Sequence, residues 1–71
     1  MRIGNVVLSQ ALRELGLSYS KIAGKLGIAK STAYWHVNYT LTEGCLSWEE
    51  RSDFQRHEAM IQAKYIALDE I

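Results

Sequence analysis

Proline is absent from this chain of 71 residues, cysteine occurs once, and there is no long apolar run. The lone Cys45 excludes an internal disulfide and suits a reducing compartment. No stretch approaches the roughly 18 apolar residues that mark a membrane-spanning helix, and the first residues lack a secretory cleavage pattern. Because proline interrupts helices, its absence favours an all-α fold. We expect a cytoplasmic protein that does not contact a membrane.

The net charge is zero, but the charges are unevenly divided along the chain. Residues 1–37 carry five lysine or arginine residues and one carboxylate. Residues 38–71 carry three lysine or arginine residues and seven carboxylates. Such a division suggests a basic end that faces nucleic acid and an acidic end that faces something else. A chance surplus of surface lysines is the alternative. A chain this short buries a small core, so we expect a partner subunit or tight helix packing to add stability.

Apolar residues recur at helical spacing in four stretches, which predicts four helices. The expected ranges are 6–15, 19–26, 30–39 and 48–68. Asn5 is expected to cap the first helix and Ser18 the second, because short polar side chains accept hydrogen bonds from free backbone amides. Gly24, inside the second helix, suggests a close approach to the first helix or to a DNA backbone. The first helix is expected to bury a single stripe, formed by Leu8, Ala11, Leu12 and Leu15.

A tight turn at Gly27 joins the second and third of these helices. Glycine at a helix end adopts the left-handed conformation without a Cβ penalty, and Ile28 is expected to fill the turn. A bracing helix, a turn and a second helix form the layout of a helix-turn-helix, whose second helix reads the major groove of DNA. On the third predicted helix, which would be the reading helix, Ala33, His36 and Val37 are expected to face inward.

The run YSKIAGKLGI at residues 19–28, followed by KSTAY at residues 30–34, resembles the helix-turn-helix of resolvase/invertase recombinases. It is similar, more loosely, to the promoter-reading module of sigma factors and to small phage, plasmid and archaeal regulators. The likeness spans residues 12–37 and implies a DNA-binding module without the catalytic domain of a recombinase. Ala29 and Ala33 depart from the pattern, since the family usually has a capping serine at the first position and a larger aliphatic residue at the second.

The third predicted helix is the expected reading element. Its first turn should meet base edges, while its flanks and the second helix should meet phosphates. Trp35 has two alternative roles. It could pack against the C-terminal helix, or it could contact DNA in the major groove. For Arg2 two alternatives stay open, a short arm in the minor groove or a terminus that docks on the core through Ile3 and Gly4. The lysines of the second helix are either phosphate contacts or simply solvated. The expected DNA-binding residues are Lys30, Ser31, Thr32, Tyr34, Trp35, Asn38, Lys21, Lys25 and Arg2.

We expect residues 1–45, which end in a connector, to form the helix-turn-helix core, and residues 46–71 to form a C-terminal helix for packing or dimerisation. Ser47 and Glu50 have the spacing of a capping box, which predicts that this helix begins beside them. Large apolar residues then recur every seven positions, but the series is too short to establish a coiled coil. Trp48 and Phe54 are expected in the protomer's own core. The far half is expected to pair with a second copy through Ile61, Tyr65, Leu68 and Ile71.

Residues with catalytic chemistry do not gather in this sequence. Residues 24–31 fall one glycine short of the phosphate-binding G-x-x-x-x-G-K-S pattern, and the preceding residues read as helix rather than strand. His36 and His57 would need further ligands to hold a metal, which Cys45 alone could add. We therefore expect no enzyme activity, cofactor, metal or small-molecule substrate.

The sequence thus predicts a sequence-specific protein for double-stranded DNA, namely a nucleoid-associated transcriptional regulator that acts as a homodimer. Two copies would place their reading helices in successive major grooves about 34 Å apart. Two alternatives stay open. The protein could serve a mobile element as an excisionase-, terminase- or replication-type accessory, or it could be an adaptor that binds another protein and no DNA.

Overall fold

A computed structural model describes residues 4–38 and 47–68 and confirms the all-α prediction. This described part contains four helices and no strand: α1 (Asn5–Glu14), α2 (Tyr19–Leu26), α3 (Lys30–Asn38) and α4 (Asp53–Leu68). None of the described helices is both long enough and apolar enough to cross a membrane. Residues 39–45 of the expected connector, Cys45 included, lie outside the described residues.

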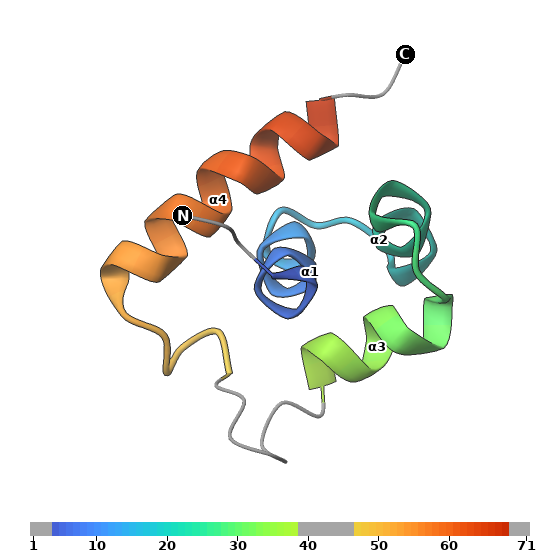
Figure 1. Cartoon of the computed structure of the whole chain (residues 1–71), viewed down its shortest axis with the longest axis horizontal. Coiled ribbons are helices and arrows are strands. Elements are labelled where there is room, and N and C mark those ends of the chain that lie inside the picture. The colour runs from blue at the N-terminus through green and yellow to red at the C-terminus, as the bar shows by residue number, and fades with distance from the viewer. Residues whose placement is uncertain (1–3, 39–46, 69–71) are drawn as a thin grey trace.

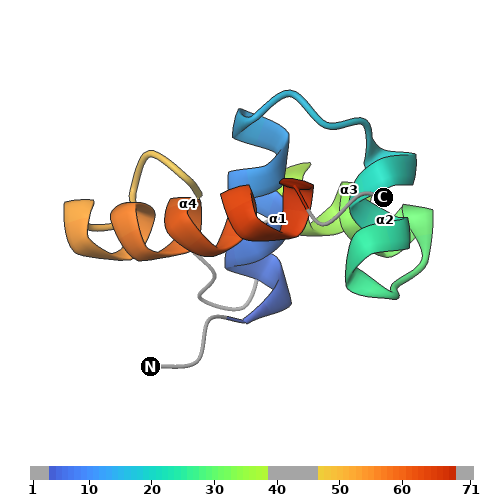
Figure 2. The same ribbon diagram turned by 90° about the horizontal axis from the view of Figure 1, so that it is seen from above.

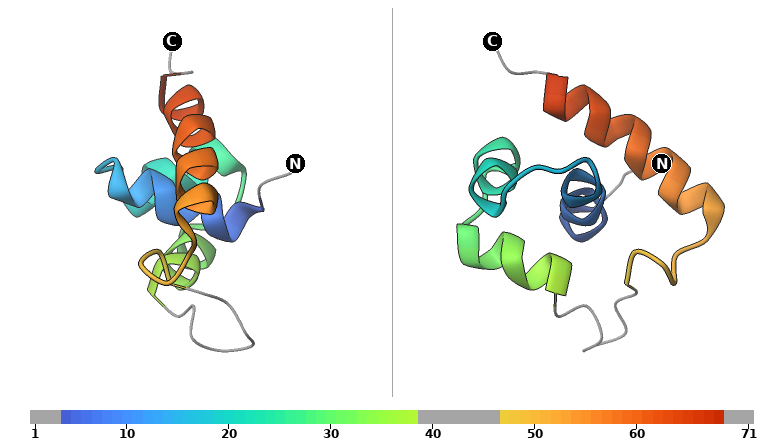
Figure 3. Two further views of the ribbon diagram at one scale, coloured as in Figure 1. Left: turned by 90° about the vertical axis from the view of Figure 1, so that its left-hand side faces the viewer. Right: turned by 180° about the vertical axis from the view of Figure 1, so that it is seen from behind.

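The central helix is α1, which has α4 on one side and α3 on the other (Figure 1). It packs against each of the other three helices, and α2 also packs against α3. The view from above shows that α4 runs across α1 (Figure 2), and the view from behind shows the same order of layers (Figure 3). α3 and α4 therefore lie on opposite sides of the protein.

The burial of α1 extends around its whole circumference. Five consecutive residues, from Leu8 to Leu12, are each at most 7% exposed. Because successive residues of an α-helix are about 100° apart, five in a row cover every side of it. The predicted stripe is confirmed, since Leu8, Ala11 and Leu12 are buried and Leu15 packs against the core, but the burial is wider than a single stripe. Ser9 and Gln10, which belong to the polar side of that pattern, are buried because helices cover α1 from two directions.

The core is built largely from alanine, whose small side chain lets helices approach closely. Only two of its seven fully packed members, Leu12 and Ile22, are large. Trp48 packs against this core from outside, as predicted. The alanines of the core are Ala11, Ala23, Ala33, Ala59 and Ala63. The last two belong to α4, so the C-terminal helix shares one core with the other three.

The ends of α1 and α2 follow simple capping rules. Ser18 caps α2, as predicted, because its hydroxyl accepts a hydrogen bond from the Lys21 amide at 3.3 Å. Gly4 rather than Asn5 occupies the cap position of α1, so that prediction was wrong by one residue. The predicted close approach of Gly24 to α1 was also wrong, because a Cβ atom at Gly24 would meet nothing within 4 Å.

The start of α4 differs from the prediction. Glu50 accepts a hydrogen bond from the Ser47 amide at 3.0 Å, as in a capping box. This bond from the Ser47 backbone holds the pKa of Glu50 below its ordinary value. It closes a turn rather than starting a helix, and α4 begins at Asp53.

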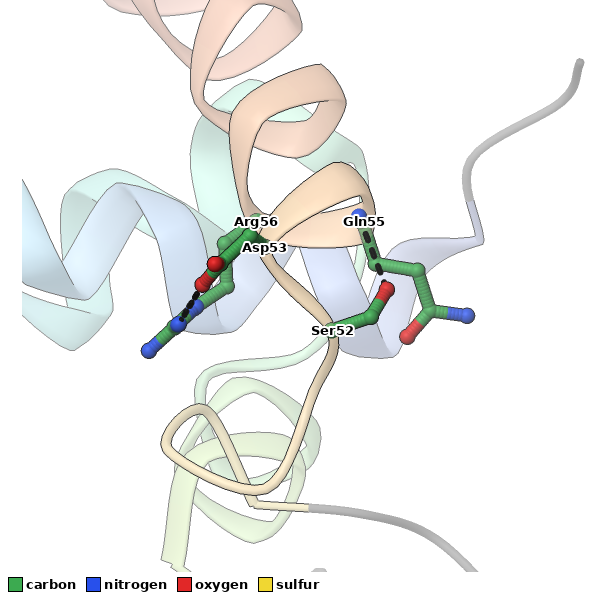
Figure 4. Close-up of polar contacts among 4 residues, drawn as sticks. All are labelled: Ser52, Asp53, Gln55 and Arg56. Carbon is green, nitrogen blue, oxygen red and sulfur yellow. Dashed lines mark hydrogen bonds and ion pairs between the residues drawn. The ribbon is translucent and has the colours of Figure 1, made fainter.

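The true cap of α4 is Ser52. Its hydroxyl accepts a hydrogen bond from the Gln55 amide at 3.2 Å (Figure 4). Asp53 and Arg56 form an ion pair across the same first turn (Figure 4). Both Ser47 and Ser52 are followed by residues that suit a helix start. The sequence alone does not show which of the two serines caps α4.

The orientation of α4 reverses one expectation. Its core-facing residues are the small Ala59 and Ala63, whereas Phe54 is 62% exposed. The prediction that Phe54 enters the core was therefore wrong. Phe54, Ile61, Tyr65 and Leu68 are exposed on α4, whereas Ile66 packs against the core beside the alanines.

Candidate nucleic-acid interface

The link between α2 and α3 is three residues long and begins at Gly27. This glycine has a φ of 69°, the left-handed conformation that the sequence predicted for it. The Ile28 amide then donates to the Ala23 carbonyl at 3.0 Å, which closes the end of α2. Ala33 is fully buried beneath this link, and Figure 1 shows α3 running across the direction of α2. Backbone hydrogen bonds and a small core residue thus fix the position of α3.

The first turn of α3 faces outward. Lys30 and Ser31 are exposed and Thr32 is half-buried. Further along the same helix, Tyr34 is 42% exposed and Trp35 is 55% exposed. Because more than half of the Trp35 side chain is exposed to solvent, packing against α4 is not its main role. The exposed side of α3 therefore combines a cation, a hydroxyl group and two aromatic rings.

Tyr19 anchors the far part of that surface, which the sequence did not indicate. Its ring meets the ring of Tyr34 edge to face, with 5.2 Å between the centroids. The Arg13 guanidinium lies over the Tyr19 ring, 4.5 Å from its centroid. The Tyr19 hydroxyl accepts a hydrogen bond from the Asn38 side chain at 2.9 Å. Tyr34 and Asn38 are therefore held in place from α2.

Asn38 has a second contact within α3, since its side-chain nitrogen also donates to the Tyr34 carbonyl at 3.1 Å. Both bonds order the last turn of the helix. The sequence gave no clue to this arrangement, because residues 13, 19, 34 and 38 are brought together only by the packing of three helices. The role of Asn38 in binding DNA stays a prediction.

The inner side of α3 is tied to α1 through polar groups. The Ser9 hydroxyl and Nδ1 of His36 are 3.3 Å apart, a hydrogen bond whose donor depends on the imidazole tautomer. The Gln10 side-chain amide donates to the His36 carbonyl at 3.4 Å. The same Gln10 accepts from Nε of Arg51 at 2.6 Å, which connects the segment before α4. Burying Ser9 and Gln10 is tolerable because both have partners.

His36 makes folding stability depend on pH. Burial lowers its pKa below the ordinary value of 6.5, because desolvation disfavours the charged imidazolium. The unfolded chain therefore binds the proton more readily than the folded protein. We expect the free energy of unfolding to be highest above pH 6.5 and to fall as the pH drops through the lowered pKa of the folded state.

Denaturant titrations between pH 5 and pH 8 would measure this dependence. The His36→Gln variant should lose the part of the slope that lies below pH 6.5, since glutamine does not titrate. Equal slopes for the two proteins would contradict a role for His36.

Positive charge is carried by α2 as well as by α3. Lys21 is exposed in the first turn of α2 and Lys25 is half-buried one turn later. Lys30 is exposed at the start of α3, the helix that α2 packs against. In residues 4–38, Glu14 is the single carboxylate. Arg2 lies outside the described residues, so its predicted position is not described.

The predicted dimerisation residues gather elsewhere. Ile61, Tyr65 and Leu68 are exposed on α4, on the other side of α1. Ile71 lies outside the described residues. With Lys64, these three residues line an open depression of about 320 Å³. The predicted DNA-binding residues of α2 and α3 and the predicted dimerisation residues of α4 therefore lie on separate parts of the protein.

A metal centre does not emerge in the described part of the chain, where no three His, Cys, Asp or Glu side chains gather closely enough to hold an ion. Comparison with protein-family models, curated proteins and solved structures found no match to this chain. Its function must therefore be inferred from its own residues.

Proposed function

We propose that this protein binds double-stranded DNA in a sequence-specific manner and acts as a transcriptional regulator. The observation that carries the proposal is the outward first turn of α3, where Lys30 and Ser31 are exposed. α3 also follows α2 through a short turn with a left-handed glycine. In a helix-turn-helix, a helix held in this way enters the major groove.

Each part of the surface has a role in this proposal. Lys30 donates to guanine acceptors and Ser31 to base edges or phosphate. Lys21 and Lys25 contact phosphates on the flank, which positions α3 without reading sequence. Tyr34 is steadied by the Tyr19 ring, so its contact to phosphate or to a thymine methyl requires little further ordering.

Trp35 supports a second candidate, a protein-binding adaptor. Its side chain is 55% exposed, and large exposed aromatic residues are common anchors of protein interfaces. The two candidates differ in what the first turn of α3 does, because an adaptor has no use for base contacts there.

Selection of bound sequences from a random duplex pool tests the proposal directly. A regulator enriches one defined motif, whereas an accessory protein of a mobile element protects repeated arrays in a footprint. A pool without enrichment, together with no mobility shift at low salt, would overturn DNA binding and favour the adaptor.

Lys21→Ala is expected to weaken binding to every duplex about equally. A phosphate contact releases about one counterion, so the slope of log affinity against log salt should fall by about 0.9. Mobility-shift titrations from 50 to 200 mM salt would measure both effects. Lys21→Arg is the matched control, because it keeps the charge and should keep the slope. A slope that is unchanged in Lys21→Ala would show that Lys21 is merely solvated.

A further inference from the structure

α4 has two different faces. Its inner face carries Ala59 and Ala63, both fully buried against α1. Its outer face exposes four large apolar residues, with Phe54 62%, Ile61 42%, Tyr65 74% and Leu68 80% accessible. We call these four residues the α4 stripe. A polar outer surface is the usual state of a helix packed on one side, so the α4 stripe requires an occupant.

The size of the α4 stripe fits a small interface. With roughly 150 Å² for each full side chain, the lower end of the range for aromatic residues, the four exposed fractions amount to roughly 400 Å² of surface. Two such surfaces bury roughly 800 Å², which is below the 1,200 Å² of a standard interface and typical of a weak or transient one. Association through the α4 stripe is therefore expected to depend on protein concentration.

The spacing of the stripe favours a second copy of this chain as the occupant. Phe54 lies seven residues before Ile61 and Leu68 lies seven after it. An antiparallel copy centred on Ile61 therefore brings Phe54 level with the second Leu68 and Ile61 level with itself. A parallel pair instead brings each charge level with its own copy, Asp53 with Asp53 and Glu58 with Glu58, which the antiparallel register avoids.

We propose that α4 pairs antiparallel with α4 of a second copy, and that the dimer holds two separate DNA segments. The second half of this inference rests on the proposed function. It follows from the layers of the fold, because α3 and α4 lie on opposite sides of α1 (Figure 1, Figure 3). Ala33 of α3 and Ala59 and Ala63 of α4 are buried in the core between them, so the exposed residues of each helix lie on its outer side.

Symmetry decides how the two α3 helices are arranged. A closed pair of identical surfaces has its twofold axis within the interface. Rotation about such an axis reverses every direction perpendicular to the interface. The two α3 surfaces therefore point away from each other at the two ends of the dimer. They do not enter neighbouring grooves on one side of a straight duplex, and each takes a duplex of its own.

A bridging assay combined with sedimentation tests both halves of the proposal. One duplex carrying the selected motif is fixed to beads, and a second, fluorescent copy is free in solution. The full chain should retain the fluorescent duplex on the beads and should sediment as a dimer at high concentration.

Ile61→Asp is expected to sediment as a monomer, to bind a single duplex with affinity within about twofold of the parent, and to lose bridging. Leu68→Asp should behave alike, and it guards against misfolding because Leu68 is the most exposed member of the stripe. Gln55→Asp adds the same charge to an exposed position of α4 outside the stripe, and should keep both the dimer and the bridging.

The outcomes separate the two inferences. A parent chain that stays monomeric, or an Ile61→Asp variant that stays dimeric, overturns pairing through the α4 stripe. A dimer that binds DNA but never retains the second duplex overturns the opposed arrangement of α3. A dimer that binds no duplex at all leaves pairing standing and overturns the proposed function instead.

Discussion

The double variant Lys30→Ala, Ser31→Ala is expected to lose affinity for the selected motif while keeping its weak affinity for unrelated duplexes. Each base contact is worth about 1–3 kcal/mol of discrimination, so two lost contacts, about 2–6 kcal/mol together, correspond to a decrease of about thirtyfold to about twenty-thousandfold. Both residues are exposed in the first turn of α3, where no core packing depends on them. Competition between motif and random duplex in a mobility-shift assay would measure the change.

The matched control is Lys64→Ala, which also removes a lysine but from the α4 side of the protein. It should leave the ratio of motif to random affinity unchanged. If the double variant discriminates as well as the parent, α3 is not the reading element. Circular dichroism of both variants should match the parent, because neither change removes a cap or a core side chain.

Leu12→Ala is expected to destabilise the fold by about 2–5 kcal/mol. Leu12 is fully buried in α1, and with Ile22 it is one of the two largest fully buried side chains of an alanine-rich core. At roughly 0.05–0.15 kcal/mol per residue, a domain of this size has only about 4–10 kcal/mol of stability. The variant should therefore be close to unfolding at room temperature.

Urea titration followed by circular dichroism would measure this loss as a lower midpoint with a similar slope. Leu68→Ala is the control, since the same side chain is 80% exposed there. At protein concentrations that keep the chain monomeric, it should change stability by less than about 0.5 kcal/mol. A loss below 1 kcal/mol for Leu12→Ala would mean that the core is packed differently.

Local chemistry made the middle of the chain predictable. Ser18 accepts the Lys21 amide and Gly27 adopts the left-handed conformation because neighbouring backbone groups require it, so the bounds of α2 were correct from sequence alone. The start of α4 was not predictable in the same way. Ser47 and Ser52 both offer a cap, and packing rather than capping places the helix at Asp53.

The site was predictable only where one helix face defines it. Helical period placed Lys30 and Ser31 outward, which the structure bears out in their exposure. It did not indicate Tyr19, whose ring braces Tyr34 and whose hydroxyl binds Asn38, because those contacts join separate helices. The function of these residues stays a proposal that the experiments above decide.

The amino-acid sequence by itself determined the all-α class, the caps and turn around α2, and the outward first turn of α3. Each depends on residues within a few positions of one another. Only the tertiary structure decided that α1 is buried on every side between Leu8 and Leu12 and that α4 turns its alanines inward. The reason is steric, since a periodic pattern identifies an apolar face, but close packing prefers the face of α4 that lets two backbones come nearest.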